Sequence, residues 1–303
     1  MANTDFCSTS GGNTGLPQCD VKMETPVGVL FVPRNAVIAA TEGDDLLKFI
    51  QDKTKENSSL LRWFPILGIE QITDSSEEPV TGNLASTGYS EKLRDGASIY
   101  MFEYPARLCK AKALKQFDQW NGGVYFITSD FKLWGKMQKD GSLVPYTPSS
   151  VAVYGGGFGD GQNIITSKLQ INMGPQGKFI EQSGFFGFDS EDDIDTITGL
   201  QTIILAPTGT ANQYQVLTKC DRMNLYDLYN TELANGTAWK ATLASTGADV
   251  ILSGVTANAG DKSFTVAFGA APTESYYLSL ADVSALETEG IVGYESEKLK
   301  IIV

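Results

Sequence analysis

The second half of the chain restricts the possible folds more than any other part. Between residues 198 and 303, short apolar or alternating segments are separated by Gly, Asn and Thr turn residues. Segments of this length and pattern indicate strands rather than helices. The predicted strands are 202–205, 214–218, 239–243, 250–255, 263–268, 276–280 and 298–303, with a short helix at 225–233 in a longer connection.

Seven short strands over about a hundred residues are typical of an immunoglobulin-like β-sandwich. Antibody domains also carry a Cys-Trp-Cys signature, which is absent here. The pattern therefore predicts the sandwich architecture alone.

The first half predicts a second β module with a single flanking helix. Residues 27–32 form a short apolar strand ended by Pro33, and alternation on both sides of Asp95-Gly96 predicts a hairpin spanning 89–104. The helix is expected over about 107–120, with Cys109, Ala113, Phe117 and Trp120 on its apolar face. Further predicted strands are 124–127 and 133–137, and a hairpin of 168–173 with 178–188 turns at residues 175–177.

An acidic cluster at 189–195 is the best boundary by composition. We therefore expect a mainly β chain with three parts: an extended N-terminal arm (1–25), a β-sandwich or barrel domain (26–190) and an immunoglobulin-like β-sandwich (196–303). The cluster itself fits a solvated linker, an acidic patch facing lysines of a neighbour, or a calcium site. An EF-hand is excluded, because Ile194 and Leu200 occupy the positions of its glycine and bidentate glutamate.

Composition argues against catalysis. The chain has no histidine, which removes Ser-His and Cys-His nucleophiles and imidazole-based zinc sites. The glycine-rich run 155–161 lacks the spacing of nucleotide-binding loops. We expect no enzymatic activity, no cofactor and no metal. One alternative is a hydrolase that uses carboxylates such as Glu70, Asp95 and Glu103. A second is a carbohydrate-binding or adhesion β-protein with a tryptophan platform, for which the candidates are Trp63, Trp120, Trp134 and Trp239.

Charge and targeting signals bound the partners. A net charge of −13 disfavours binding of nucleic acid through a basic face. The first 20 residues lack the basic and apolar regions of a signal peptide, and the longest apolar run is too short to cross a membrane. The four cysteines leave two readings open: a bridge between Cys7 and Cys19, or four free thiols.

The order of elements from residue 81 to 169 resembles the tail-tube family of tailed bacteriophages. The residues that carry this resemblance are 89–96, 117–121, 124–130 and 133–135. The second half is similar to the immunoglobulin-like decorations of phage virion proteins. Its stretches 224–227 and 290–295 resemble structural proteins of phages of gut Bacteroidetes.

The resemblance implies a virion structural protein, assembled in the host cytoplasm, whose copies form homo-oligomeric rings. The expected partners are further copies of the chain, other virion proteins, and DNA that passes through the lumen without specific binding; no membrane is expected. A collar, connector or capsid-associated ring protein is an alternative. The candidate oligomer-interface residues are Tyr89, Asp95, Gly96, Tyr100, Gly157, Phe158 and Phe179.

Overall fold

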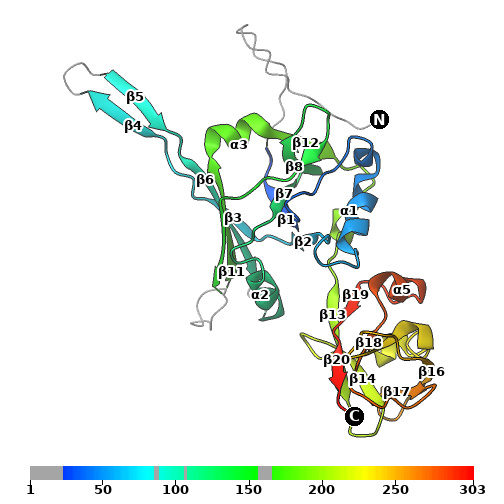
Figure 1. Cartoon of the computed structure of the whole chain (residues 1–303). Coiled ribbons are helices and arrows are strands. Elements are labelled where there is room, and N and C mark those ends of the chain that lie inside the picture. The colour runs from blue at the N-terminus through cyan, green and yellow to red at the C-terminus, as the bar shows by residue number, and fades with distance from the viewer. Residues whose placement is uncertain (1–22, 85–88, 106–107, 156–165) are drawn as a thin grey trace. The chain divides into compact units, whose positions relative to one another are not determined.

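The computed structural model describes residues 23–84, 89–105, 108–155 and 166–303 (Figure 1). The chain divides into two compact units: unit 1 comprises Met1–Thr54 and Leu60–Ile197, and unit 2 comprises Lys55–Ser59 and Thr198–Val303. Both units are built from several β-sheets with few helices, so the predicted mainly β sandwich or barrel class is confirmed.

Two sheets form the body of unit 1. Sheet A has the order β12-β8-β7-β1-β2, and β9 pairs with β8; sheet B has the order β10-β11-β6-β3. The strands of sheet A are β1 (Pro26–Val32), β2 (Phe64–Leu67), β7 (Gly123–Thr128), β8 (Lys132–Met137), β9 (Leu143–Val144) and β12 (Ser183–Gly187). Those of sheet B are β3 (Gln71–Asp74), β6 (Ala97–Pro105), β10 (Ser150–Gly155) and β11 (Thr166–Pro175).

Sheet A is buried on both faces. In β1, Val29 and Phe31 pack into the core between the two sheets, while Leu30 and Val32 pack into a second core on the opposite face. Because successive strand residues point to opposite faces, a strand buried on both sides has a continuous apolar sequence. This explains why the predicted strands at 27–32 and 124–127 are confirmed.

In the described part of unit 1, three α-helices and two short 3-10 helices accompany these sheets. The 3-10 helix η1 (Glu42–Asp45) leads into α1 (Leu46–Thr54), whose Leu46 and Ile50 fill the second core of sheet A. Helix α2 (Leu108–Lys115) packs against β10 and β11, and α3 (Gln176–Gln182) carries the chain from sheet B to sheet A. A short 3-10 turn, η2 (Ile194–Thr196), lies near the end of unit 1.

An aromatic cluster fastens the segment after α2 to sheet A. The rings of Phe31 and Phe117 stack with centroids 4.3 Å apart, and Trp120 contacts both edge-on at 5.7 and 5.6 Å. Offset and edge-to-face rings at these distances attract one another beyond the effect of burial. The predicted roles of Phe117 and Trp120 in packing are therefore confirmed.

Unit 2 is a two-sheet sandwich. One sheet has the order β16-β17-β14-β13-β19 and the other β15-β18-β20. If β13 to β18 are lettered A to F, the sheets read D-E-B-A and C-F, as in constant-type immunoglobulin sandwiches. The last strand is divided between the sheets: β19 pairs with β13 (A) and β20 pairs with β18 (F). The elements are β13 (Gln201–Pro207), β14 (Gln213–Thr218), α4 (Tyr226–Tyr229), η3 (Gly236–Ala238), β15 (Trp239–Leu243), β16 (Leu252–Asn258), β17 (Ser263–Phe268), β18 (Tyr276–Leu280), α5 (Val283–Thr288), β19 (Tyr294–Ser296) and β20 (Leu299–Ile301).

The core of unit 2 centres on Trp239, which is 5% exposed. Its indole N–H donates to the carbonyl oxygen of Leu233 over 2.7 Å, and its ring packs against Phe264. Strand C of antibody domains also carries a buried tryptophan. The seven predicted strands all occur, and β19 is an additional short strand that the sequence analysis missed.

Three local predictions for unit 1 are wrong. Asp95-Gly96 is not a hairpin turn, because β5 (Tyr89–Arg94) pairs with β4 (Val80–Leu84) whereas β6 pairs with β3 and β11. The segment after Pro175 forms helix α3 rather than the returning strand of a hairpin. Helix α2 ends at Lys115 instead of residue 120, and its buried position is Leu114 rather than Ala113.

Candidate assembly surface

The outer face of sheet B is polar. Its inner face carries Phe102, Tyr104, Leu169 and Ile171, which belong to the core between the sheets. The register places the outward residues in rows across the four strands. One row is Tyr154, Lys168, Glu103 and Gln71, and the next is Ala152, Gln170, Met101 and Thr73.

Hydrogen bonds link the outward side chains of neighbouring strands. Lys168 Nζ donates to Glu103 Oε1 over 2.8 Å, and Thr166 Oγ1 donates to Glu103 Oε2 over 2.9 Å. The bond from Lys168 is the main reason that the pKa of Glu103 lies below its usual value, and the same bond raises the pKa of Lys168. The Tyr154 hydroxyl donates to Gln170 Oε1 over 3.0 Å.

The charge of these two rows is close to zero. Glu103 and Lys168 are their only ionisable groups apart from the Tyr154 phenol, and they neutralise each other. The acidic net charge of the whole chain was the reason to expect weak binding of DNA. These two rows would bind DNA weakly because they are neutral: they carry no surplus of lysine or arginine that could attract phosphate.

Strand β3 is the open edge of sheet B. The N–H groups of Ser75 and Glu77 donate to the carbonyl oxygens of Ile99 and Ala97. Because an antiparallel ladder bonds alternate residues, Ile72 and Asp74 direct their backbone groups away from β6. Within the described residues no further strand pairs with β3, so its outer edge is available to another chain.

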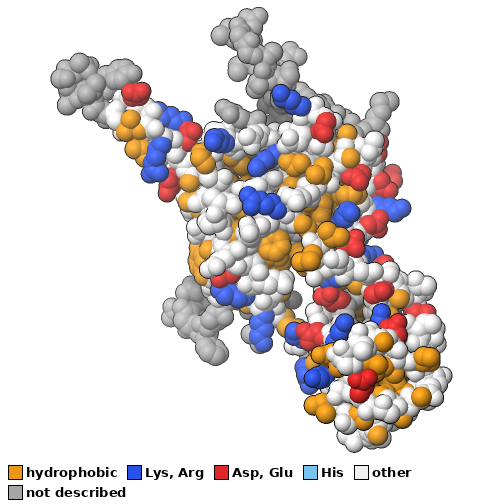
Figure 2. Space-filling view, in the orientation of Figure 1, with side chains coloured by type: hydrophobic (Ala, Val, Ile, Leu, Met, Phe, Trp, Pro, Cys, Tyr) orange, Lys and Arg blue, Asp and Glu red, His pale blue; other side chains and the backbone are white. Residues whose placement is uncertain are grey.

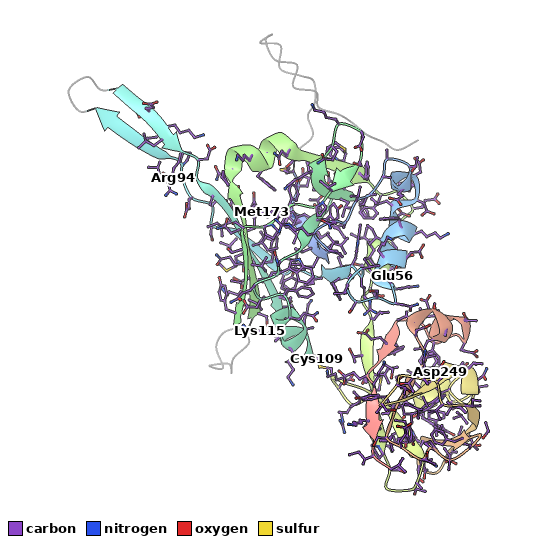
Figure 3. The ribbon with its side chains drawn as sticks, viewed as in Figure 1. Glu56, Arg94, Cys109, Lys115, Met173 and Asp249 are labelled. Atoms are coloured by element: carbon purple, nitrogen blue, oxygen red, sulfur yellow. The ribbon has the colours of Figure 1, made fainter. Side chains whose placement is uncertain are left out.

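The opposite edge, β10, is partly occupied by the segment after α2. Gln119 N–H donates to the Val151 carbonyl over 3.0 Å, and Val153 N–H donates to Asp118 Oδ1 over 3.0 Å. Lys115 lies beside this segment on α2 (Figure 3) and forms an ion pair with Asp118 over 2.7 Å. Side-chain capping of this kind protects an edge strand from pairing with other chains.

A separate β-hairpin, β4–β5, projects from the end of sheet B where β3 and β6 meet (Figure 1). In the described part of the chain, β4 and β5 pair only with each other. Leu93 on this hairpin is 65% exposed and Val80 is 38% exposed. A lone two-stranded hairpin is marginally stable in water, so this element gains from contact with a further surface.

The base of the hairpin is held by close backbone packing. A Cβ atom added to Gly96 would lie 1.8 Å from the Glu77 carbonyl oxygen, so only glycine fits there. The Gly96 carbonyl accepts a hydrogen bond from Gln176 N–H over 3.0 Å, and Asp95 forms an ion pair with Lys92. Arg94 lies at this base (Figure 3), and the visible face of the hairpin mixes basic, acidic and apolar side chains (Figure 2).

The predicted interface residues fall into three groups. Tyr89 begins β5 of the hairpin, and Asp95 and Gly96 lie at its base. Tyr100 and Phe179 contact each other inside unit 1, with ring centroids 6.1 Å apart, and Phe179 is buried. Gly157 and Phe158 lie outside the described residues. The sequence pattern did not single out Leu93, Val80 or the edge of β3.

The residues named for the alternative functions are not brought together into a site. Trp63, Trp134 and Trp239 are buried and Trp120 packs against the core, so they form no exposed platform. Across the described ranges, no group of three or more His, Cys, Asp or Glu side chains could hold a metal ion, and this includes the acidic cluster 189–195, for which a calcium site was one alternative.

Both cysteines of the described ranges, Cys109 and Cys220, are disulfide-bonded. Of the two readings left open by the sequence, four free thiols is therefore wrong for Cys109 and Cys220. Cys7 and Cys19 lie outside the described residues.

No helix among the described residues is long and apolar enough to cross a membrane. No family model matches the chain, and no curated protein or solved structure is significantly similar to it.

Proposed function

We propose that the chain is a non-enzymatic structural protein of a bacteriophage virion, and that its copies assemble into a ring of the tail-tube type. The observation that carries the proposal is the β4–β5 hairpin, which exposes Leu93 and Val80 and has no partner strand within the described residues. A neighbouring copy would cover this hairpin. Collar and connector rings would use the same contact.

The strand directions of sheet B are compatible with ring closure. Each neighbouring pair in the order β10-β11-β6-β3 is antiparallel, so the two outer strands run in opposite directions. With four strands per copy, edge-to-edge addition gives only antiparallel pairs, whatever the number of copies. A closed barrel built in this way would leave no exposed sheet edge.

Because the edge of β10 is capped, the β4–β5 hairpin is the better candidate for the first contact between copies. Direct pairing of β3 with a neighbour's β10 requires displacement of Asp118 and Gln119, whereas a contact through β4–β5 does not. The hairpin therefore joins copies first, and the polar outer face of sheet B lines the lumen. Unit 2 is an immunoglobulin-like decoration of the ring.

The mass of the purified chain in solution tests the proposal. Mass photometry should show multiples of the 32.7 kDa chain. Leu93→Glu should shift the population toward single copies, because it places a charge in the covered contact. Replacement of residues 79–95 by a two-residue turn should abolish assembly while the rest of the chain still unfolds cooperatively on heating.

Ile251→Glu is the matched control, since Ile251 is 77% exposed and belongs to unit 2. It should assemble like the parent chain. A parent chain that is monomeric, or assemblies that persist without the hairpin, would contradict the proposed role. A monomer that binds glycans would favour a carbohydrate-binding or adhesion protein instead.

A further inference from the structure

An open pocket of about 610 Å³ lies at one end of sheet A. Its charged lining is entirely basic: Arg34 follows β1, Lys136 lies near the end of β8, and Lys139 lies in the turn from β8 to β9. The amide side chains of Asn35, Gln138 and Gln182 complete its polar wall. Such a set of donors is suited to a carboxylate or another oxyanion.

Among the described residues, the three cationic groups of this pocket have no anionic partner. No ion pair in the described residues involves Arg34, Lys136 or Lys139. The nearest acid in sequence, Asp140, accepts hydrogen bonds from the backbone N–H and the hydroxyl of Ser142, at 3.0 and 2.6 Å. Burial without a nearby anion lowers the pKa of Lys136. In a chain of net charge −13, three uncompensated cations in one pocket are unexpected.

A group of acidic side chains lies at the opposite end of the same sheet. Strand β12 ends at Gly187 beside Lys132, the first residue of β8, whereas Lys136 lies at the pocket end beside Ser183. The six residues of β8 span about 20 Å. The loop after β12 carries Asp189, Glu191, Asp192, Asp193 and Asp195. In the part of the chain that the structure describes, none of them pairs with Lys or Arg.

We propose that the basic pocket binds the acidic loop 189–195 of a second copy, in a head-to-tail contact along the strands of sheet A. The inference rests on the pocket, whose cations need an anionic partner. We choose the loop 189–195 as that partner because it holds a group of carboxylates without a paired Lys or Arg in the described residues. The two surfaces lie on opposite ends of one sheet, so the contact is heterologous, and a straight head-to-tail repeat of it would give an open stack. It rests on the proposed function, in which it would stack one ring on the next.

Charge reversal with exchange tests the contact. One variant carries Arg34→Glu and Lys139→Glu, and the other carries Asp193→Lys and Asp195→Lys. Negative-stain images of each variant alone should show single rings and no stacks. An equal mixture of the two should restore stacks of alternating copies, because each reversed surface then meets its complement. Lys300→Glu, in unit 2, is the control for a change in net charge and should stack like the parent.

The outcomes separate this contact from ring formation. Rings that stack normally in either variant, or a mixture that does not recover, would overturn it. If the parent forms no rings, the proposed function fails, but sedimentation velocity of the mixed variants still decides the pocket: association that neither variant shows alone supports the contact, and its absence overturns it. Titration with inorganic phosphate tests whether the pocket binds a small free anion instead of the acidic loop. Saturable binding by the parent, lost in the pocket variant and without recovery in the mixture, would identify a small-anion site and reject the contact between copies.

Discussion

Glu103 and Lys168 lie opposite each other on β6 and β11, the two central strands of sheet B, and Lys168 Nζ donates to Glu103 Oε1 over 2.8 Å. Both groups face outward, where the proposed function places the lumen. The pair makes this part of the surface neutral.

The pair gives stability a defined pH dependence. The pKa of Glu103 is lowered in the folded state, so its contribution is complete above the usual glutamate pKa and disappears as the pH falls through the folded value. The raised pKa of Lys168 preserves its contribution up to the usual lysine pKa, and that contribution is lost as the pH rises through the folded value. Glu103→Gln should therefore destabilise the protein slightly at pH 7 and make less difference near pH 3. Urea unfolding at both pH values measures this, and Glu70→Gln, an exposed acid nearby, should leave the difference unchanged.

Truncation of Phe117 should be among the more damaging core changes in unit 1. Its ring stacks on Phe31 and contacts Trp120 and Phe64. Phe117→Ala should cost about 3–5 kcal/mol, because it removes buried area and leaves a cavity. Leu60→Ala, at a position 82% exposed, should change the free energy of unfolding by less than about 0.5 kcal/mol. Equal effects of the two in denaturant titration would contradict this packing.

Gly96 should tolerate no side chain. Gly96→Ala would place its Cβ atom against the Glu77 carbonyl and force the backbone at the base of the hairpin to move, at a cost of about 1–3 kcal/mol. Gly187→Ala is the matched control, since its Cβ atom would meet nothing within 4 Å. Thermal unfolding of both variants tests the close approach, and a Gly96→Ala protein as stable as the control would disprove it.

The buried hydroxyl of Tyr104 should be dispensable. Neither this hydroxyl nor Ser167 Oγ, opposite it in the register, has a hydrogen-bond partner among the described residues, and burial raises the pKa of Tyr104. Because the hydroxyl lost its hydrogen bonds to water on folding without a replacement, Tyr104→Phe should be neutral or stabilising. Tyr125→Phe is the contrast: the Tyr125 hydroxyl donates to the Leu143 carbonyl over 3.0 Å and should cost about 1 kcal/mol when removed. Reversed signs in denaturant titration would refute the assignment.

The sequence predicted strands best where each face of the strand has a single environment along its whole length. The strands of unit 2 and the doubly buried β7 were predictable from apolar patterning, because their side chains meet only the core or only solvent on each face. The pair Asp95-Gly96 led to a wrong prediction of a hairpin turn. Glycine is required at position 96 because the backbone comes close to Glu77, not because the chain turns there. The segment after Pro175 was predicted to be a strand because of its apolar residues. These residues instead belong to a short helix, in which Phe179 faces the core.

The candidate surface was harder to predict than the fold. The capped edge of β10 depends on Asp118, which lies 35 residues before Val153 in the sequence, and no local pattern links them. The open edge of β3 likewise becomes visible only when its sole neighbour is known to be β6. Tyr89, Asp95 and Gly96 were assigned to a hairpin that does not exist, although they belong to, or adjoin, the β4–β5 hairpin that does.

Electron microscopy of the purified full-length chain is the most direct test of assembly into rings. Negative-stain class averages should show rings or short tubes with a central channel, and the same preparation of the variant without residues 79–95 should show single particles. Uniform single particles from the parent chain, at concentrations where mass photometry finds only 32.7 kDa, would contradict the account.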